Sequence, residues 1–462
     1  MTFYLIFDKL NMGDKMKYIK KYYKNIILLI VLIVFATTLP IINKDWILYN
    51  TNIQDISILD LSFLSISKSI SLVLSKYYII KVTFIPLIIL FLFISIKNFI
   101  NNKNNSLIFI GISLFFLTNY NILYSSLSVS NILYNLVPFF LFIIIINLIL
   151  KDLLYKVPKV LIIILGLIAS IFSLNYGLII LMMLVSTYLI KLYNKENNKY
   201  ILMILIGVIL GNVINFSIYD TNIFTFNIYD ITKNIMHTIV PTFMNINFIF
   251  TLIIMISLFI NLIKLYSSNK INKMETIILV LITSLYPFAT LLSSNLIINY
   301  ISFILFNMST YFILIKISTN SLKERINLIY IFKVLYIILI SLLKEVPTSY
   351  FISYVLIDII IILEFVNKMF KDNQLIHAWF IVTVLSILLE IHVNSELMIK
   401  NKYLNAFLYR DLSCEINRIV LPNKYKKNNY DMFIPTNDTE KVEYLKYLEI
   451  DSTLDYEIIT KE

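Results

Sequence analysis

The sequence contains very few of the residue types on which many common functional sites depend. Its 462 residues include one cysteine, three histidines and six glycines. The single cysteine, Cys414, excludes an intramolecular disulfide and any cysteine-built metal site. With three histidines far apart in the chain, zinc, haem and iron–sulfur chemistry are poor candidates. The scarcity of glycine also leaves no glycine-rich phosphate loop. We therefore predict no resident metal site built from cysteine and histidine.

Apolar residues are abundant instead. Hydrophobic residues make up 59% of the chain, against about 45–50% in an ordinary globular protein. The mean hydropathy is +0.82. A membrane-spanning helix needs about 20 apolar residues, so this supply is enough for roughly a dozen spans. The composition excludes an ordinary soluble domain and favours an integral membrane protein.

Hydropathy along the chain predicts an all-α polytopic membrane protein of about 11–13 transmembrane helices, similar in layout to the GT-C proteins discussed below. The segments at 106–119 and 158–174 contain the shortest apolar runs, which fit a re-entrant segment as well as a span. In the helix at 200–218, Gly207 and Gly211 stand four residues apart and are expected to let a neighbouring helix approach. The predicted helices lie at residues 24–42, 79–97, 106–119, 132–150, 158–174, 176–192, 200–218, 247–264, 275–293, 296–316, 326–343, 348–366 and 376–393.

Basic residues alternate between the predicted loops. The chain has 39 Lys and Arg against 28 Asp and Glu, a net charge of +11. Every second loop is basic, and short basic loops favour the cytoplasmic side. The charge is thus explained by topology and requires no nucleic-acid partner. The basic segments contain Lys15, Lys17, Lys20, Lys21 and Lys24; Lys97 and Lys103; Lys151, Lys156 and Lys159; Lys191, Lys195 and Lys199; Lys264, Lys270 and Lys273; Lys316, Lys323 and Arg325; Lys368 and Lys371.

This pattern predicts the organisation of the chain in a bacterial inner membrane. Residues 1–23 are expected to form a cytoplasmic basic N-terminus, residues 24–393 a transmembrane domain, and residues 394–462 an extracytoplasmic tail. Two long loops, 43–78 and 219–246, are expected on the same outer face as the tail. Because the polar mass gathers on one face, we expect function there.

The first outer loop carries a carboxylate and an indole immediately after the first predicted span, in Lys44-Asp45-Trp46. Trp46 is placed as an interfacial anchor, and the apolar and serine-rich residues 61–74 fit a helix on the membrane surface. Asp45 is either a solvated loop residue or a catalytic one. A carboxylate at this level can accept the proton of a hydroxyl acceptor, or hold a divalent cation that bridges a phosphate.

At this loop the chain resembles a known class. A basic N-terminus, one span, an Asp-Trp loop leading into an interfacial helix, many further spans and a soluble outer tail resemble the GT-C glycosyltransferases. The resemblance is to poorly characterised bacterial polytopic members whose first outer loop starts with Asp-Asp-Trp or Asp-Asp-Tyr. Here Lys44 replaces the first acid, so a single carboxylate remains and a divalent cation stays an open question.

Two further segments carry the resemblance. Members of this class carry a polar outer segment before a later span. In this sequence the residues that resemble it are Ser128, Ser130, Asn131, Tyr134 and Asn135. The tails of these proteins carry an Arg, then an acidic residue followed by a hydrophobic one, then a short strand that begins with Asp and ends with Pro. The residues here that resemble this pattern are Arg410, Glu415-Ile416 and Asp431-Met432-Phe433-Ile434-Pro435, with Asn428-Asn429 where a glycine is expected. The resemblance implies a donor sugar linked to polyprenyl phosphate, with Asp45 as the catalytic base and Trp46 beside the substrate.

Other polar residues of the outer face are candidates for substrate binding. The loop at 219–246 contains Asp230, Lys233 and His237. Lys233 and His237 would bind a phosphate and Asp230 would support the base, or all three are scattered loop charges. Lys344 ends a predicted span on the same face, where it would hold a lipid diphosphate or lie in an exposed turn.

Four charged residues fall inside predicted spans: Lys333, Asp358, Glu364 and Glu390. Charges in a bilayer are costly unless they are paired or face water, so they are functional candidates. Lys333 and Asp358 lie on adjacent antiparallel spans at depths that permit an ion pair. The alternatives are a structural pair and a path for protons or substrate.

The tail is expected to dock on the membrane domain because about 69 residues with so few apolar runs would hardly fold alone. Tyr403, Phe407, Leu408, Leu412 and Ile416 recur at helical spacing and predict an amphipathic helix. A short strand is expected at 430–435.

These observations support three hypotheses. The first is a membrane glycosyltransferase-like protein that passes a sugar from a polyprenyl-phosphate donor to a cell-envelope glycan, lipid or protein. The second is a transporter or flippase of lipid-linked glycans that uses the buried charges, although the internal repeats common in transporters are not visible. The third is a non-catalytic relative, which the Lys44 replacement leaves open. The expected partners are the lipid-linked donor and membrane lipids.

Overall fold

The structure is a computed structural model of the 462-residue chain. It describes residues 12–39, 70, 78–100, 105–118, 120–128, 131–193, 195, 198–218, 224–239, 248–292, 295–318, 320–344, 346, 348–369, 376–404, 408–411, 416–422 and 456–461.

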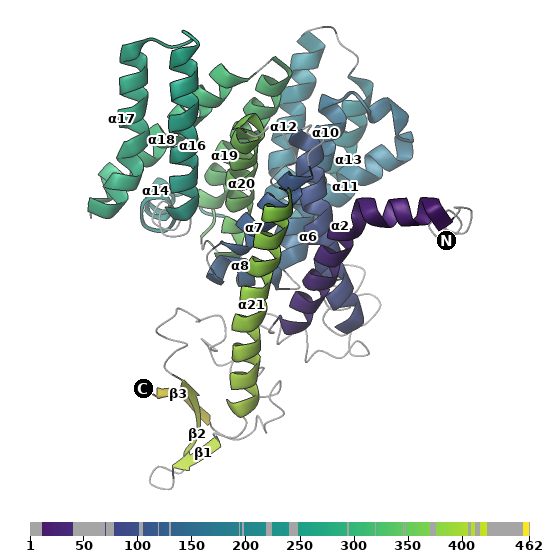
Figure 1. The fold of residues 1–462 in the computed structure, drawn as a ribbon, viewed down its shortest axis with the longest axis vertical. Coiled ribbons are helices and arrows are strands. Elements are labelled where there is room, and N and C mark those ends of the chain that lie inside the picture. Colours follow the sequence, from purple (N-terminus) through teal and green to yellow (C-terminus); the bar gives the residue numbers. More distant parts are fainter. Residues whose placement is uncertain are drawn as a thin grey trace.

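The described chain is a bundle of helices with a small sheet at one end (Figure 1). Every predicted span coincides with a helix, and the boundaries differ by a few residues in most cases. The longer helices are α2 (Met12–Thr38), α6 (Tyr78–Ile100), α7 (Ser106–Phe116), α10 (Val137–Leu150), α11 (Lys159–Ile171), α12 (Leu174–Tyr193), α13 (Lys199–Ile218), α16 (Phe248–Ser267), α17 (Lys273–Leu292), α18 (Leu296–Ile317), α19 (Asn320–Ser341), α20 (Phe351–Met369) and α21 (Ile376–Leu404). Short helical segments complete them: α8 (Tyr120–Leu127), α14 (Ile228–Lys233), the π-turns η2 (Ile132–Leu136) and η5 (Asn234–Ile239), and the 3-10 turns η3 (Leu154–Lys156) and η6 (Thr348–Tyr350).

Six helices of the described part are long and apolar enough to cross a membrane, by length and composition. This agrees with an α-helical multi-pass membrane protein. The six segments are Ile79–Ile100, Ile132–Leu150, Leu174–Tyr193, Lys199–Phe216, Ile297–Ile317 and Ile376–Asn394. The two segments with the shortest predicted runs are short helices, α7 with 11 residues and α11 with 13.

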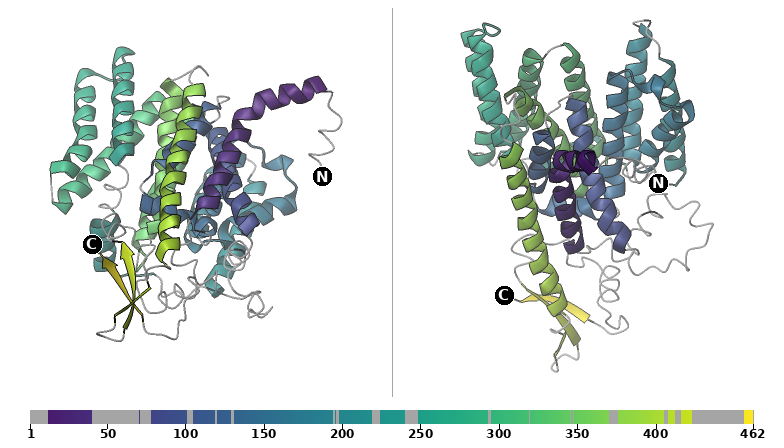
Figure 2. Two further views of the ribbon diagram at one scale, coloured as in Figure 1. Left: turned by 60° about the horizontal axis from the view of Figure 1, so that its bottom comes forward. Right: turned by 45° about the vertical axis from the view of Figure 1, so that its right-hand side comes forward.

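The first helix is longer than predicted, because α2 begins at Met12 rather than near residue 24. Its N-terminal part lies across the bundle before the helix turns along it (Figures 1 and 2). The basic, tyrosine-containing stretch that was expected to precede the span is therefore helical too. At its other end, α2 stops at Thr38, close to where the first outer loop was predicted to begin.

The bundle has two distinct ends. We call the end that carries the small sheet the sheet end, and the opposite one the basic end (Figure 1). The sheet end includes the last turn of α2, the short helix α8 and the C-terminal half of α21. The basic end includes the short connection after α10, with Lys151 and Lys156, and the connection between α12 and α13, with Lys195.

Helices α11 and α13 approach each other closely through glycine. A Cβ atom on Gly207 would lie 2.1 Å from the backbone oxygen of Ile163, and one on Gly166 would lie 2.4 Å from that of Ile204. A Cβ on Gly211 would lie 2.0 Å from the Ser170 hydroxyl. Gly207 and Gly211 thus let a neighbouring helix approach, as predicted, and the crossing is of the small-residue type found in membrane proteins. Asn215 Nδ2 also donates across it to the Ser170 carbonyl, at 2.6 Å.

Basic residues hold the C-terminus of α6 at the basic end. Lys151 Nζ donates to the Asn98 carbonyl at 2.9 Å, and an Arg325 Nη1 hydrogen bond reaches the Phe99 carbonyl. Both carbonyls belong to the last turn of α6, where the helix dipole favours positive charge. Burial, and then the charge of Arg325, lower the pKa of Lys151. The residues that indicated topology in the sequence therefore also cap a helix.

We expect Arg325→Ala to lower the free energy of unfolding by about 1.5–3 kcal/mol, the usual contribution of a hydrogen bond from a charged group. The measurement is unfolding of the purified protein in detergent. Lys323→Ala is the matched control, because it removes the same charge from the same helix at a half-buried position. Equal losses in the two variants would show that charge alone, and not the contact with α6, is responsible.

The tail differs from its prediction. The helix expected over residues 403–416 is wrong: α21 continues to Leu404, and β1 (Leu408–Asp411) and β2 (Ile416–Pro422) follow. β1 pairs antiparallel with β2, with Leu408 opposite Ile419, and β2 pairs in parallel with β3 (Tyr456–Lys461). The apolar residues at helical spacing also suit strands, and β-branched Ile416, Ile419 and Val420 favour them. The strand predicted at 430–435 lies outside the described residues.

Candidate functional site

The residues with the strongest sequence argument lie outside the described part of the chain. These are Asp45 and Trp46, with the surrounding loop at 43–78 except Ile70 and Tyr78. The structure does describe the helix end from which this loop leaves. The hydrogen bonds at this end of α2 form the first part of the candidate site.

The last turn of α2 is joined to α21. Asn394 Nδ2 donates to the Thr38 hydroxyl at 3.3 Å, and that hydroxyl donates in turn to the Phe35 carbonyl at 2.8 Å. Asn394 is fully buried. Since Thr38 precedes Asp45 by seven residues in the sequence, the base of the Asp45 loop is held against α21.

A carboxylate lies one helical turn before Asn394 on α21. Glu390 Oε2 accepts a hydrogen bond from the Tyr124 hydroxyl at 2.8 Å. Tyr124 belongs to α8 and is buried, whereas Glu390 is half-buried. Residues at i and i+4 share a helix face, so α21 presents Glu390 and Asn394 together at the sheet end. We call Thr38, Tyr124, Glu390 and Asn394 the α21 polar cluster.

The serine- and asparagine-rich segment identified in the sequence directly follows α8 and continues into the π-turn η2. Ser128 accepts from the Asn131 backbone N–H at 3.3 Å, and Asn131 Nδ2 donates to the Ser125 carbonyl at 2.7 Å. Asn135 lies in η2 and is fully buried, and neither polar atom of its side-chain amide makes a hydrogen bond with the residues that the structure describes. Ser130 lies outside the described residues. Because this segment directly follows α8, which holds Tyr124, it adjoins the α21 polar cluster.

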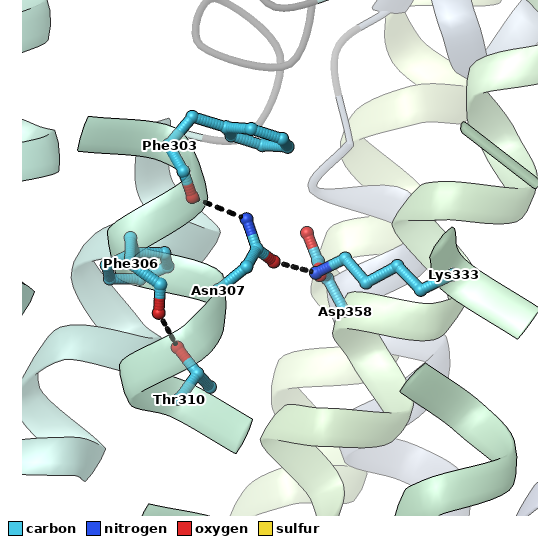
Figure 3. A network of polar contacts seen from close by, with 6 residues as sticks. All are labelled: Phe303, Phe306, Asn307, Thr310, Lys333 and Asp358. Carbon is cyan, nitrogen blue, oxygen red and sulfur yellow. Dashed lines mark hydrogen bonds and ion pairs between the residues drawn. The ribbon is translucent and has the colours of Figure 1, made fainter. Parts of the chain in front are cut away.

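The predicted Lys333–Asp358 pair is confirmed (Figure 3). Lys333 Nζ lies 2.9 Å from Asp358 Oδ1, and both side chains are 6% exposed. Asn307 on α18 accepts a second hydrogen bond from Lys333, at 2.6 Å, and its own amide nitrogen donates to the Phe303 carbonyl at 2.9 Å. Lys333 also stands 4.4 Å from the ring centre of Tyr354, as a cation–π contact. The pair therefore links α18, α19 and α20 in the interior.

Glu364 has a different positive neighbour. It lies on α20, is 2% exposed, and is close enough to Arg325 on α19 to interact with its charge. Arg325 is the residue that reaches the end of α6. Glu364 thus lies toward the basic end, about two helical turns from Asp358 along α20.

The described part of the loop predicted at 219–246, residues 224–239, docks on the end of α19. Asn234 Nδ2 donates to the carbonyls of Ser341 at 3.2 Å and Leu343 at 2.6 Å, and the Thr225 N–H donates to Leu342 at 2.7 Å. These bonds satisfy the C-terminal carbonyls of the helix.

The charged residues of this loop differ in their hydrogen bonding and in their exposure. Asp230 accepts a hydrogen bond from the Thr225 hydroxyl at 3.1 Å, while Lys233 is exposed. Lys344 directly follows Leu343, whose carbonyl accepts a hydrogen bond from the loop, and it is also exposed. The loop therefore lies beside Lys344, and Asp230 has a structural partner within its own loop. His237 lies in η5, and its side chain is outside the described residues.

Sequence reasoning missed three partners: Asn307, Tyr124 and Arg325. Asn307 gave a signal, as an amide in the middle of a predicted span, where polar side chains seek partners. Tyr124 gave none, because tyrosine is common in this chain. In the sequence Arg325 indicated only topology. Its hydrogen bond to α6 joins residues 226 positions apart, so no local pattern predicts it.

Among the described residues, no three His, Cys, Asp or Glu side chains gather as a metal site. Comparison of the chain with protein-family models, curated proteins and solved structures found no match. The argument about function therefore depends on the residues alone.

Proposed function

We propose that the protein is a membrane glycosyltransferase-like enzyme working at the face formed by the sheet end. It would take a sugar from a polyprenyl-phosphate donor and pass it to an envelope glycan, lipid or protein. One observation carries this proposal: the Asn394–Thr38 hydrogen bond brings the base of the Asp45 loop to the helix that presents Glu390. Polar residues from distant parts of the chain thus meet at the helix end that precedes Asp45 in the sequence, and this supports the proposal.

In this proposal Asp45 is the base that accepts the proton of the acceptor hydroxyl as that oxygen attacks the anomeric carbon of the sugar, whose bond to the phosphate oxygen breaks so that the polyprenyl phosphate leaves. Glu390, oriented by Tyr124, is a positioning residue on α21, the helix that holds the end of α2. Trp46 would contact the substrate at the membrane boundary. Lys233 and Lys344, both exposed at the same end, are suited to the charge of the donor phosphate.

The alternative function is transport of lipid-linked glycans through the buried charges. The Lys333–Asp358 contact is the observation that favours it, because an ionisable pair in a membrane interior is a functional candidate. Against it, Lys333 is already held by Asp358, Asn307 and the Tyr354 ring. A pair so fully engaged is better suited to joining helices.

The test is glycan profiling of the native cell surface in a deletion strain, complemented with wild type or with Asp45→Asn. We expect wild type to restore a missing sugar and Asp45→Asn to restore none, because the amide cannot accept the proton. Membrane protein levels must be equal in both strains. Glu390→Gln, which keeps the Tyr124 hydrogen bond, should restore most of the sugar. Full restoration by Asp45→Asn would refute the proposal, and loss in Asp358→Asn alone would favour transport.

A further inference from the structure

A cleft opens at the basic end, away from the α21 polar cluster. Its volume is about 520 Å³, within the range of about 300–1,000 Å³ typical of small-molecule sites. It lies where the end of α10 and the turn η3 meet the end of α12 and the start of α13. Its lining consists of Ile149, Asp152, Leu154, Tyr155, Lys191, Tyr200 and Ile201.

The lining combines an apolar wall with a charged edge. Lys191 Nζ pairs with Asp152 Oδ1 at 3.1 Å; the lysine side chain is 19% exposed and the aspartate 80%. Asp152 has a positive φ of 48°, a conformation that Asp and Asn tolerate better than most residues. The carboxylate thus projects from a tight turn and holds the lysine at the rim.

Positive charge exceeds negative charge around the cleft. The ammonium of Lys156 lies 5.6 Å from the ring centre of Tyr155, which lines the cleft. Lys199 directly precedes the lining residue Tyr200 in α13, and Lys195 is exposed in the connection before it. In the sequence, the stretches 151–159 and 191–200 contain six lysines (Lys151, Lys156, Lys159, Lys191, Lys195 and Lys199) against two acidic residues, Asp152 and Glu196. The site is therefore suited to an anion.

The surroundings indicate an anion attached to a lipid. Large apolar side chains close in sequence to the lining residues are exposed: Leu189 at 56%, Ile190 at 61% and Val160 at 68%. Tyr155 is 61% exposed and carries a hydroxyl on an apolar ring, as do tyrosines at membrane interfaces. Basic pockets between membrane helices bind anionic headgroups. A lipid would place its phosphate at Lys191 and its chains along this apolar surface.

We propose that the cleft formed by α10, η3, α12 and α13 binds the phosphate headgroup of an anionic phospholipid, with Lys191 as its principal contact. The ligand would exchange with Asp152, which occupies the ammonium of Lys191 in the structure. This site is independent of the proposed transferase reaction, because it lies at the opposite end of the bundle.

The test measures binding of dioctanoyl phosphatidylglycerol to the full-length protein in detergent by microscale thermophoresis. Lys191→Gln should weaken binding about tenfold, as loss of one charged hydrogen bond predicts. Asp152→Asn, which keeps the turn conformation available, should strengthen binding because it releases Lys191. Lys264→Gln is the matched control, an exposed lysine at the end of α16, and should leave the affinity unchanged.

Three further ligands separate the sources of the phosphate. Dioctanoyl phosphatidylcholine tests the headgroup charge, while glycerol phosphate and inorganic phosphate test whether a lipid is needed. We expect all three to bind more weakly than phosphatidylglycerol. Equal binding of a soluble phosphate would overturn the lipid assignment, and equal losses in Lys191→Gln and Lys264→Gln would overturn the site. The opposite signs expected for Lys191→Gln and Asp152→Asn keep the test decisive, since misfolding would weaken both.

Discussion

A Lys333→Met variant is expected to lose about 3–5 kcal/mol of stability, the usual result of removing one partner of a buried ion pair. The reason is that the Asp358 carboxylate, on a side chain 6% exposed, would lose the ammonium that now lies 2.9 Å from it. Asn307 would lose its charged donor in the same step. The measurement is unfolding of the purified protein in detergent, with near-wild-type helix content required in the folded state.

The double variant Lys333→Met/Asp358→Leu should recover most of this loss. Apolar residues of similar size can replace a buried pair at little net cost, because neither charge then needs desolvation. A double variant no more stable than the single one would contradict this account. The same protein also tests transport: if it folds and still restores the cell-surface sugar, the pair joins helices and does not carry substrate.

Gly207→Ala is expected to destabilise the protein by about 1–3 kcal/mol, although alanine favours helices over glycine by about 1 kcal/mol. The added methyl would lie 2.1 Å from the Ile163 oxygen and 2.9 Å from the Leu167 nitrogen. Both atoms belong to the backbone of α11, so the two helices would have to move apart. Thermal unfolding in detergent measures the effect.

The matched control for this variant is Gly111→Ala in α7. There the added methyl would meet the ring of Phe93, at 2.6 Å, and a side chain of Leu363. Side chains can shift where a backbone cannot, so we expect a smaller loss. A larger loss for Gly111→Ala than for Gly207→Ala would show that side-chain packing, rather than the approach of two backbones, limits stability here.

The helical framework was predictable because its signal is local. Each span needs a continuous apolar run, and such runs are visible in the sequence without knowledge of the fold. The Lys333–Asp358 pair was also predictable, since the antiparallel order of two consecutive helices fixes the depth of both charges. By contrast, the tail was misjudged at residues 403–416, because a few apolar residues at mixed spacing fit a helix and a hairpin almost equally.

Most of the candidate site was not predictable for a different reason. Tyr124 and Glu390 are 266 residues apart, and Thr38 and Asn394 are 356 apart. Neutral hydroxyls and amides in apolar segments have many possible partners, and the sequence contains no rule for choosing among them. Asp45 stays a prediction from sequence, and the structure adds the helix end that carries its loop.

The shortness of α11 has a consequence for how the protein is made. Its 13 residues are about 20 Å long, which is less than the hydrocarbon thickness of about 30 Å. Alone, this helix would enter a bilayer poorly. Its glycine-lined partner α13 begins 28 residues after α11 ends, and α12 separates them. During synthesis α11 must therefore be retained near the insertion machinery until α13 emerges, so the three helices should enter the membrane as one group.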